Sequence, residues 1–568
     1  MVDDPFNILR WTRTRHGRSD SNAPTARPSR VSHLTRRIKC DQSRPTCRRC
    51  DSTGRECDGY DVTNSHSAME QAKRSIQPKP SFPLAFSVKE PLGLSLKELE
   101  AFHFFCQYSA HEIPGCFSSD LWERVILQMT HQEPSLRHAV VAVGSLHQRC
   151  RGMARTKSGR GEMKWSQEFP VLQYIKALQH LRQRLSRAHD PLAAPVALIA
   201  CLLFMCLEML QGNRMGAVEH LRTGLQILAG IPSLFAVHHD QLPHRYLYLQ
   251  STFSTSLLHQ VAAQFASLDF EATGFGERSP VLHLAAQGVE MGDRMALPSS
   301  FSSVGEARSY LEILSNGLLH LRGELLQLAE SHLPRDETDW VIRHCRQHAL
   351  VRSIDLIDHA HLLTHLAQLQ TLFAAWLVAF RNLTMNPLYG CSRATMLLEM
   401  RHFSMTFVAA TTRETQEVRC DQFEPQFRRI ISIARQFVHS LITAQPSMTF
   451  TLVSGGIHCL YIVATKSRDP MTRREAIILL RRIPCQEGMW DGPLMARFTE
   501  QLVEWEESMA QIIAGRPPHT PKDVPEAARV ADAVLVGMDR PGSGRLVCSR
   551  HLHETTGELQ IIEREFSF

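Results

Sequence analysis

Four cysteines near the N-terminus have the spacing of a metal site. They follow the pattern Cys40-x6-Cys47-x2-Cys50-x6-Cys57. Thiolates hold zinc in a tetrahedron, and a gap of two residues lets one turn present two sulfurs to the same ion. The sequence therefore predicts a Zn²⁺ cofactor with these four cysteines as its metal ligands. An unliganded or disulfide-bonded segment is the alternative.

Basic side chains precede and interleave with these cysteines: Arg36, Arg37, Lys39, Arg44, Arg48, Arg49 and Arg55. Residues 1–60 hold 13 Arg or Lys against 7 Asp or Glu, and the whole chain carries a net charge of +6. The positive charge is therefore concentrated at this end of the chain. Zinc can fold a segment that is too small to fold alone, and the basic side chains can then meet phosphates and base edges. This pattern predicts double-stranded DNA as the partner.

Residues 36–60, RRIKCDQSRPTCRRCDSTGRECDGY, resemble the fungal six-cysteine binuclear zinc cluster of transcription factors. The resemblance implies two zinc ions held by two short helix-loop halves, with the four cysteines as the third to sixth of the family and Cys47 as a bridging ligand. It implies that Arg36 and Arg37, beside Lys39, read bases of CGG triplets, because Arg can donate two hydrogen bonds to guanine. Arg48 and Arg49 are expected to hold phosphates. Such a factor would regulate RNA polymerase II transcription in the nucleus, with the transcription machinery or co-regulators as further partners.

The first half of the zinc cluster motif departs from the family. Its first two cysteines are absent, and Arg30 and His33 hold their positions. Two four-coordinate zincs that share two sulfurs need eight metal–sulfur bonds, and four cysteines with one bridge supply at most five. Arg13–Gly17 resembles the basic segment that normally leads into the first cysteine, but residues 18–35 separate it from Arg36, a longer stretch than the family has. A retained intron in the gene model and genuine degeneration both explain this.

The remainder of the chain is predicted to be mostly α-helical. Residues 61–92 are rich in Ser, Pro and Gln and show no heptad repeat, so they are typical of a linker. Ser95 and Glu98 fit a capping box that begins the first helix. Apolar spacing predicts further helices over Leu121–Met129, Ser135–Cys150, Val171–Arg187, Val196–Leu210, Gly216–Ala229, Ser309–Leu333, Ile354–Leu383, Phe423–Thr443, Thr472–Arg482 and Leu494–Ile513.

The C-terminal tail has a different pattern. Arg529–Val536, Arg545–Ser549 and Leu559–Arg564 are short runs with strand propensity, separated by turn residues, and they predict a small antiparallel meander. The sequence thus predicts a basic zinc-cluster region over 1–60, a linker over 61–94, an all-α regulatory domain with a single extended core over 95–515, and a tail with short strands over 516–568.

A second resemblance supports the first. Glu133–Ala139, Ala197–Glu208, Tyr461–Pro470 and the stretch from Arg473 to Trp490 are similar to the helical middle region of one large group of these fungal factors. This likeness extends over most of residues 95–510. It implies a helical regulatory domain and says little about the regulated genes.

Several features that could suggest a membrane span, a metal site or a ligand contact have simpler structural interpretations. Residues 192–207 carry no charge, but they are shorter than the roughly 20 residues of a membrane span and contain Pro195, so they predict a buried helix and no membrane partner. Asp358, His361 and His365 lie on one helix face but lack the glutamate of a zinc-protease motif, so a metal site is not expected there. Arg473 and Arg474 are expected at a solvated or salt-bridged surface, and Trp490 in the core.

Composition and motifs favour a regulator over an enzyme. Hydrophobic residues make up 43% of the chain and charged residues 21%, as in globular proteins. Residues 1–15 lack the apolar core of a secretory signal, so a reducing compartment is expected. In such a compartment, scattered cysteines are expected to pack as small apolar side chains. The sequence shows no glycine-rich phosphate loop and no nucleophile elbow. An enzyme with an unrecognised site and a regulator without DNA binding remain alternatives, and a homodimer is left open.

Overall fold

The computed structural model describes residue 52 and residues 93–156, 168–187, 190–236, 246–249, 256–273, 279–286, 297–334, 339–390, 392–444, 450–540, 543–551 and 559–567. The chain divides into two compact units, residues 1–85 and 86–568. The fold described below is that of the second unit. The boundaries at residues 60, 94 and 515 stay predictions.

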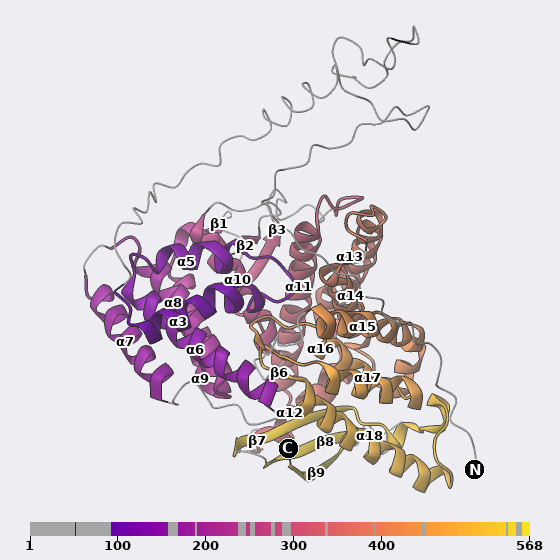
Figure 1. Cartoon of the computed structure of the whole chain (residues 1–568). Coiled ribbons are helices and arrows are strands. Elements are labelled where there is room, and N and C mark those ends of the chain that lie inside the picture. The colour runs from indigo at the N-terminus through magenta and orange to yellow at the C-terminus, as the bar shows by residue number, and fades with distance from the viewer. Residues whose placement is uncertain are drawn as a thin grey trace. The chain divides into compact units, whose positions relative to one another are not determined.

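The first half of this unit packs around one apolar helix. Helix α8 (Ala193–Leu210) has almost every residue buried, because it is apolar on all sides. Figure 1 shows it among its indigo and magenta neighbours. These neighbours are α3 (Leu96–Phe104), α5 (Ile126–Met129), α6 (Pro134–Thr156), α7 (Glu168–Leu185), α9 (Arg214–Ala229) and α10 (Leu257–Ala272). The short α4 (Ala110–Glu112) and the π-helical turns η1 (Phe105–Ser109) and η2 (Leu121–Val125) complete this half.

The second half is a larger set of helices, drawn from rose to yellow in Figure 1. Trp376 and Phe373 of the long α13 are fully buried in its core, and Trp490 is buried there as predicted. The helices are α11 (Val304–Glu330), α12 (Trp340–Ser353), α13 (Ala360–Thr384), α14 (Arg393–Thr411), α15 (Glu424–Ala444), α16 (Ile457–Lys466), α17 (Pro470–Arg482) and α18 (Gly492–Ala514).

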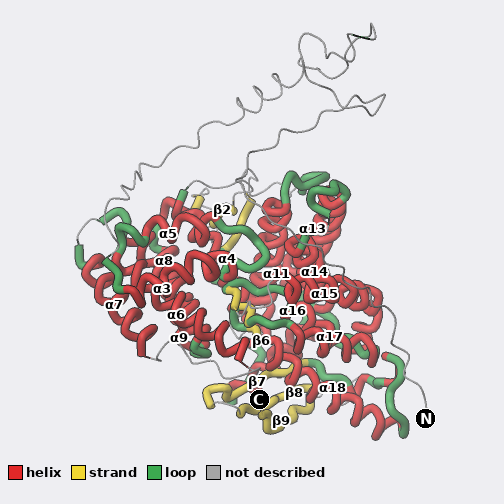
Figure 2. The backbone as a smooth tube through the Cα atoms, in the orientation of Figure 1, coloured by secondary structure: helices red, strands yellow, loops and turns green. Residues whose placement is uncertain are grey.

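Helix starts follow the local sequence. Ser95 caps α3 as predicted: its hydroxyl accepts a hydrogen bond from the Glu98 amide, and its own amide donates to Glu98 Oε2 at 2.9 Å. Asp469 caps α17 by accepting a hydrogen bond from the Thr472 amide at 3.0 Å, and Pro470 follows at the first helical position. The chain is mostly α-helical, as the sequence predicts (Figure 2).

Within the described part of the chain, three small sheets accompany the helices. Two of them, β1–β3 (Phe235–Ala236, Tyr246–Leu249, His283–Ala286) and β4–β6 (Phe450–Thr451, Gln486–Glu487, Trp490–Asp491), lie within the region expected to be all helical. The third is the predicted antiparallel meander, β7 (Asp532–Arg540), β8 (Ser543–His551) and β9 (Leu559–Ser567). The strands β4–β6 bring the two halves together, since the Leu452 amide donates to the Ile113 carbonyl at 2.8 Å.

The buried side chains form two large clusters, so the predicted single core is wrong. Buried carboxylates lie at and beside β4–β6, where residues of both clusters meet. Glu487 accepts hydrogen bonds from the amides of Gly455 and Ile457, both at 2.9 Å, and Glu271 accepts one from the Ser454 amide at 2.5 Å. Burial raises the pKa of Glu271 to about 7, with Arg401 acting against that rise. The carboxylates satisfy the backbone that enters α16 but interrupt apolar packing.

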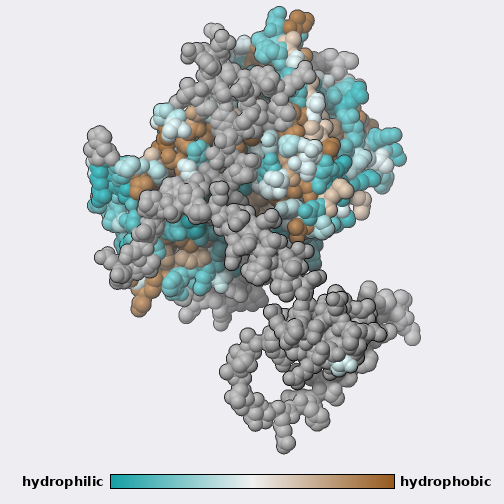
Figure 3. Space-filling view, turned by 90° about the horizontal axis from the view of Figure 1, so that it is seen from above, coloured by the Kyte–Doolittle hydropathy of each residue, from teal (hydrophilic) through white to brown (hydrophobic). Residues whose placement is uncertain are grey.

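Two helices are long and apolar enough to cross a membrane by length and composition alone, Ala193–Leu210 and Ile357–Thr384. The first is 78% buried inside the protein, which matches the predicted core helix. The second buries one face through Leu366, Phe373 and Trp376. On the face of the molecule drawn in Figure 3, hydrophilic and hydrophobic residues of the described part are interspersed.

Gly144 of α6 lies where α3 approaches most closely. A Cβ added there would collide with the Ala101 carbonyl and lie 3.1 Å from the Phe105 Cβ. Backbone cannot move aside as a side chain can, so we expect Gly144→Ala to lower the free energy of unfolding by about 1–3 kcal/mol. Gly152 of the same helix faces open space, and Gly152→Ala should instead raise it by about 0.4–1 kcal/mol. Urea denaturation followed by circular dichroism measures both, and equal effects would contradict the packing argument.

Candidate functional site

The zinc ligands and DNA-binding residues predicted from the sequence lie outside the described residues. This holds for Cys40, Cys47, Cys50 and Cys57 and for Arg36, Arg37, Lys39, Arg48 and Arg49. Their roles therefore stay predictions. The ten other cysteines that the structure describes are free thiols, and most of them are buried, as expected for small apolar side chains. The second unit has polar sites of its own.

The most highly charged buried site surrounds Glu417, which begins the 3-10 helix η6 (Glu417–Phe423) and is 2% exposed. Its carboxylate lies 2.7 Å from Arg352 Nη1, 3.0 Å from Lys466 Nζ and 3.4 Å from Arg468 Nη1. Burial alone would raise the pKa of Glu417, but these three cations hold it well below its usual range. Glu417 is therefore an ionised carboxylate at physiological pH.

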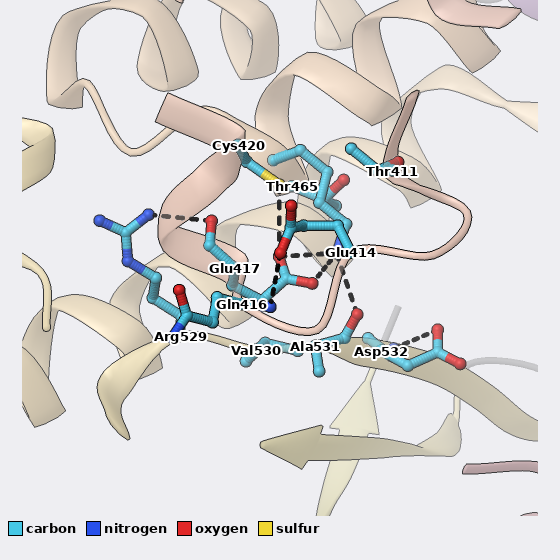
Figure 4. A network of polar contacts seen from close by, with 12 residues as sticks. Thr411, Glu414, Gln416, Glu417, Cys420, Thr465, Arg529, Val530, Ala531 and Asp532 are labelled. Carbon is cyan, nitrogen blue, oxygen red and sulfur yellow. Dashed lines mark hydrogen bonds and ion pairs between the residues drawn. The ribbon is translucent and has the colours of Figure 1, made fainter. Parts of the chain in front are cut away.

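The same site binds the C-terminal segment to the helices. Lys466 Nζ and Arg352 Nη2 donate to the Ala531 carbonyl at 2.9 and 3.2 Å. Arg529 Nη1 donates to the Glu417 carbonyl at 3.2 Å, which Figure 4 draws as the dashed line between these two residues. These three cations thus fix the residues that lead into β7.

A second buried carboxylate continues this network. Glu506 of α18 is fully buried, and its two oxygens lie 2.8 Å from Arg468 Nη2 and 2.6 Å from Arg473 Nη2. Glu506 also accepts a hydrogen bond from the Val530 amide at 2.6 Å. The prediction that Arg473 lies at the surface is wrong, because Glu506 offers it a buried counter-charge. Arg474, the next residue, is exposed and pairs with Glu507 at 2.5 Å, as predicted.

A cavity of about 220 Å³ lies beside Glu417. Its walls come from α11, α12, α14, α16, α18 and the start of β7. Arg322, Arg352, Lys466, His348 and Asp532 supply the charged or titratable side chains of the lining. The remainder of the lining is largely apolar: Leu326, Val351, Phe407, Val408, Tyr461, Ile462, Leu502, Val530 and Ala533, with three threonines and Ala531.

Two histidines and an aspartate cluster at one side of this cavity. His344 Nε2 and His348 Nδ1 lie 3.6 and 3.4 Å from Asp532 Oδ2. Within the described residues, that oxygen is buried and accepts no hydrogen bond. Burial lowers the pKa of His348 to about 4, so His348 is neutral at physiological pH. Sequence reasoning does not predict this cluster, because the histidines and Asp532 are far apart in the chain. By contrast, Asp358, His361 and His365 are exposed and form no such group.

Comparison with known families decides the class of the protein. Residues 101–449, more than half of the chain, match the fungal specific transcription factor domain. Residues 35–67 match the fungal Zn(2)-Cys(6) binuclear cluster domain, whose members bind zinc. The chain belongs to this family of fungal transcription factors. It is accordingly a zinc-binding, DNA-binding transcription regulator, as the sequence predicts. The zinc-cluster match begins at residue 35, after the residues where the first two cysteines are missing.

Proteins similar to this chain are also named as transcription regulators. The aspercryptin biosynthesis cluster-specific transcription regulator of Emericella nidulans is 26% identical, over 87% of this chain and 89% of that protein. A transcription regulator of Purpureocillium lilacinum is 29% identical over 37% of this chain and 52% of its own length. A transcriptional regulatory protein of Schizosaccharomyces pombe is 47% identical over 58 residues, 10% of this chain and 11% of its own. No solved structure matches the chain.

Proposed function

We propose that this factor is a nuclear, sequence-specific regulator of RNA polymerase II transcription that reads CGG-type sites. In this proposal Cys40, Cys47, Cys50 and Cys57 bind zinc. Arg36 and Arg37 reach base edges, Lys39 contacts the DNA beside them, and Arg48 and Arg49 hold phosphates. The observation that carries the proposal is the match of residues 35–67 to the zinc cluster domain on a chain whose larger part belongs to the regulatory domain family. The chain has no enzymatic role in this proposal, and co-regulators and a second copy are its proposed protein partners.

The donor set fits one zinc better than two. Four thiolates complete the tetrahedron of a single ion, whereas a binuclear cluster needs six cysteines. A segment this short has almost no apolar core, so its folding draws on the metal. An incomplete cluster therefore favours a second candidate, a regulator that keeps the helical domain but does not read DNA sequence. Binding of the full chain to CGG-containing and random duplexes at matched salt separates the two, since equal affinities would establish the second.

We further propose that the regulated genes form a biosynthetic gene cluster. The support is the relative from Emericella nidulans, whose likeness extends over nearly the full length of both proteins. Deleting the gene for this factor and measuring transcripts across the genome tests this. The proposal fails if the affected genes are scattered with no shared cluster.

Base readout by Arg37 has a specific expected effect. Arg37→Ala should weaken binding to a CGG-containing duplex by about 1–3 kcal/mol and relax the preference at one position of the triplet. Arg48→Ala is the matched control, because loss of a phosphate contact weakens binding to all duplexes alike. Competition binding with single-base variants of the site measures both. A loss for Arg37→Ala that is equal on random and CGG-containing DNA would contradict the assigned role.

A further inference from the structure

The cavity beside Glu417 contains one cation more than its carboxylates offset. Arg352 and Lys466 share Glu417 as their counter-charge. Arg322 has no such partner among the described residues, and its guanidinium donates a single hydrogen bond, from Nη1 to Thr412 Oγ1 at 3.3 Å. Among the described residues, Asp532 is the one carboxylate that lines the cavity, and it lies against His344 and His348.

A half-buried guanidinium without a carboxylate partner is costly for a protein to keep. Burial and the neighbouring Arg352 lower the pKa of Arg322, and the charge of Asp532 offsets this only in part. Arginine presents a planar set of donors that matches a carboxylate through two parallel hydrogen bonds. Arg322 therefore presents guanidinium donors that could bind the carboxylate of a ligand.

The other residues that line the cavity indicate the chemistry of the rest of the ligand. Buried Leu326, Phe407 and Leu502 contribute apolar surface to the lining. Tyr461 also lines the cavity, and its hydroxyl makes no hydrogen bond within the described residues, so it is free to bind a polar substituent. A volume of about 220 Å³ suits a small organic molecule. We propose that this cavity binds a small organic acid, with its carboxylate on Arg322 and its apolar body against Leu326, Phe407 and Leu502.

A metal ion on His344, His348 and Asp532 is the competing occupant. The ligand atoms of these residues lie within 4.8 Å of one another, which is close enough for coordination. However, Arg322, Arg352 and Lys466 line the same cavity and would repel a divalent cation. Glu417 is already the counter-charge of Arg352 and Lys466. The charge balance therefore favours an anion over a metal.

The position of the cavity gives ligand binding a structural consequence. Its walls belong to α11, α12, α14, α16 and α18 and to Val530–Ala533 at the start of β7. A ligand that contacts all of them stabilises the packing of the C-terminal sheet on the helices. The proposal concerns binding to the regulatory domain and holds whether or not the N-terminal segment reads DNA.

Thermal unfolding of the full chain tests the proposal with four defined acids: benzoate, phenylacetate, indole-3-acetate and octanoate. The uncharged amide of each acid is its matched control, and zinc chloride tests the metal. We expect at least one acid to raise the unfolding midpoint while its amide does not. Arg322→Met should raise the dissociation constant of that acid by more than about tenfold, because a charge-assisted hydrogen bond is lost.

The ligand-free variants give an independent readout. Arg322→Met should raise the unfolding midpoint, since it removes an unpaired cation, whereas Arg381→Met on the exposed face of α13 should leave it unchanged. Arg322→Lys keeps the charge without the planar donors and should bind the acid with intermediate affinity. The proposal is overturned if none of the four acids stabilises the chain, if the amides act equally, or if zinc alone stabilises it and His348→Gln abolishes that effect.

Discussion

An Arg30→Cys/His33→Cys double variant is expected to bind two zinc ions per chain, where the unaltered chain binds at most one. These two positions are where the first two cysteines of the zinc cluster family fall, and the other four cysteines are present. Restoring them supplies the missing metal–sulfur bonds, including the second bridge, and with them the free energy that folds the segment. We expect its preference for CGG-containing over random DNA to rise on the order of 10³-fold.

Zinc content by mass spectrometry and competition binding at fixed salt measure this prediction. The control is Arg30→Ser/His33→Ser, which makes the same two changes without a thiolate and should bind no more zinc than the unaltered chain. Two zincs and tight CGG binding by the unaltered chain would contradict our ligand count, and His16, His33 or a further cysteine would then complete the site. Sequencing the transcript decides whether residues 18–35 are a retained intron, which a shorter junction with two cysteines would establish.

The zinc motif could be predicted from sequence because its ligands are local. Cys47 and Cys50 are separated by two residues, and their spacing alone indicates a shared metal. The cap at Ser95 is local in the same way. Helices with one apolar stripe, such as α18, can also be predicted from sequence, since their apolar periodicity indicates a single buried face.

Among the described α-helices longer than one turn, those that the sequence did not predict are α10, α12, α14 and α16. Helix α16 has seven of its ten residues buried, and α14 is buried through residues on several sides, including His402 and Ser404. A helix buried on several sides has no polar face, so its sequence lacks the alternation that periodicity detects. The two-residue strands of β4–β6 are too short for any pattern, and their existence depends on the contact between the two halves.

The charged site around Glu417 could not be predicted because its members come from distant segments. Arg352, Glu417, Lys466 and Ala531 belong to four segments that are far apart in the chain. In sequence, a charged residue without a visible partner indicates a surface position, and on this ground the sequence predicts a surface position for Arg473. The structure buries Arg473 because Glu506, 33 residues away, supplies its counter-charge. Pairing over such separations is visible only in three dimensions.

Glu506→Gln is expected to lower the free energy of unfolding by about 3–5 kcal/mol, the range for breaking a buried ion pair. The substitution keeps the shape of the side chain but leaves Arg473 buried without a carboxylate, and leaves Arg468 with only Glu417 at 3.4 Å. The hydrogen bond from the Val530 amide also weakens, because it loses a charged acceptor. The loss therefore extends to the contact between α18 and the C-terminal segment.

Glu507→Gln is the matched control, one residue further along the same helix. Glu507 pairs with Arg474, whose side chain is 51% exposed, and such pairs contribute about 0–1 kcal/mol. Urea denaturation, followed by both circular dichroism and tryptophan fluorescence, measures the two variants and checks that unfolding is two-state. A Glu506→Gln/Arg473→Met double variant should recover part of the loss, because it removes the orphaned cation as well as its partner. If Glu506→Gln costs no more than Glu507→Gln, the buried network does not stabilise the fold, and the assignment of Glu506 as the counter-charge of Arg468 and Arg473 is wrong.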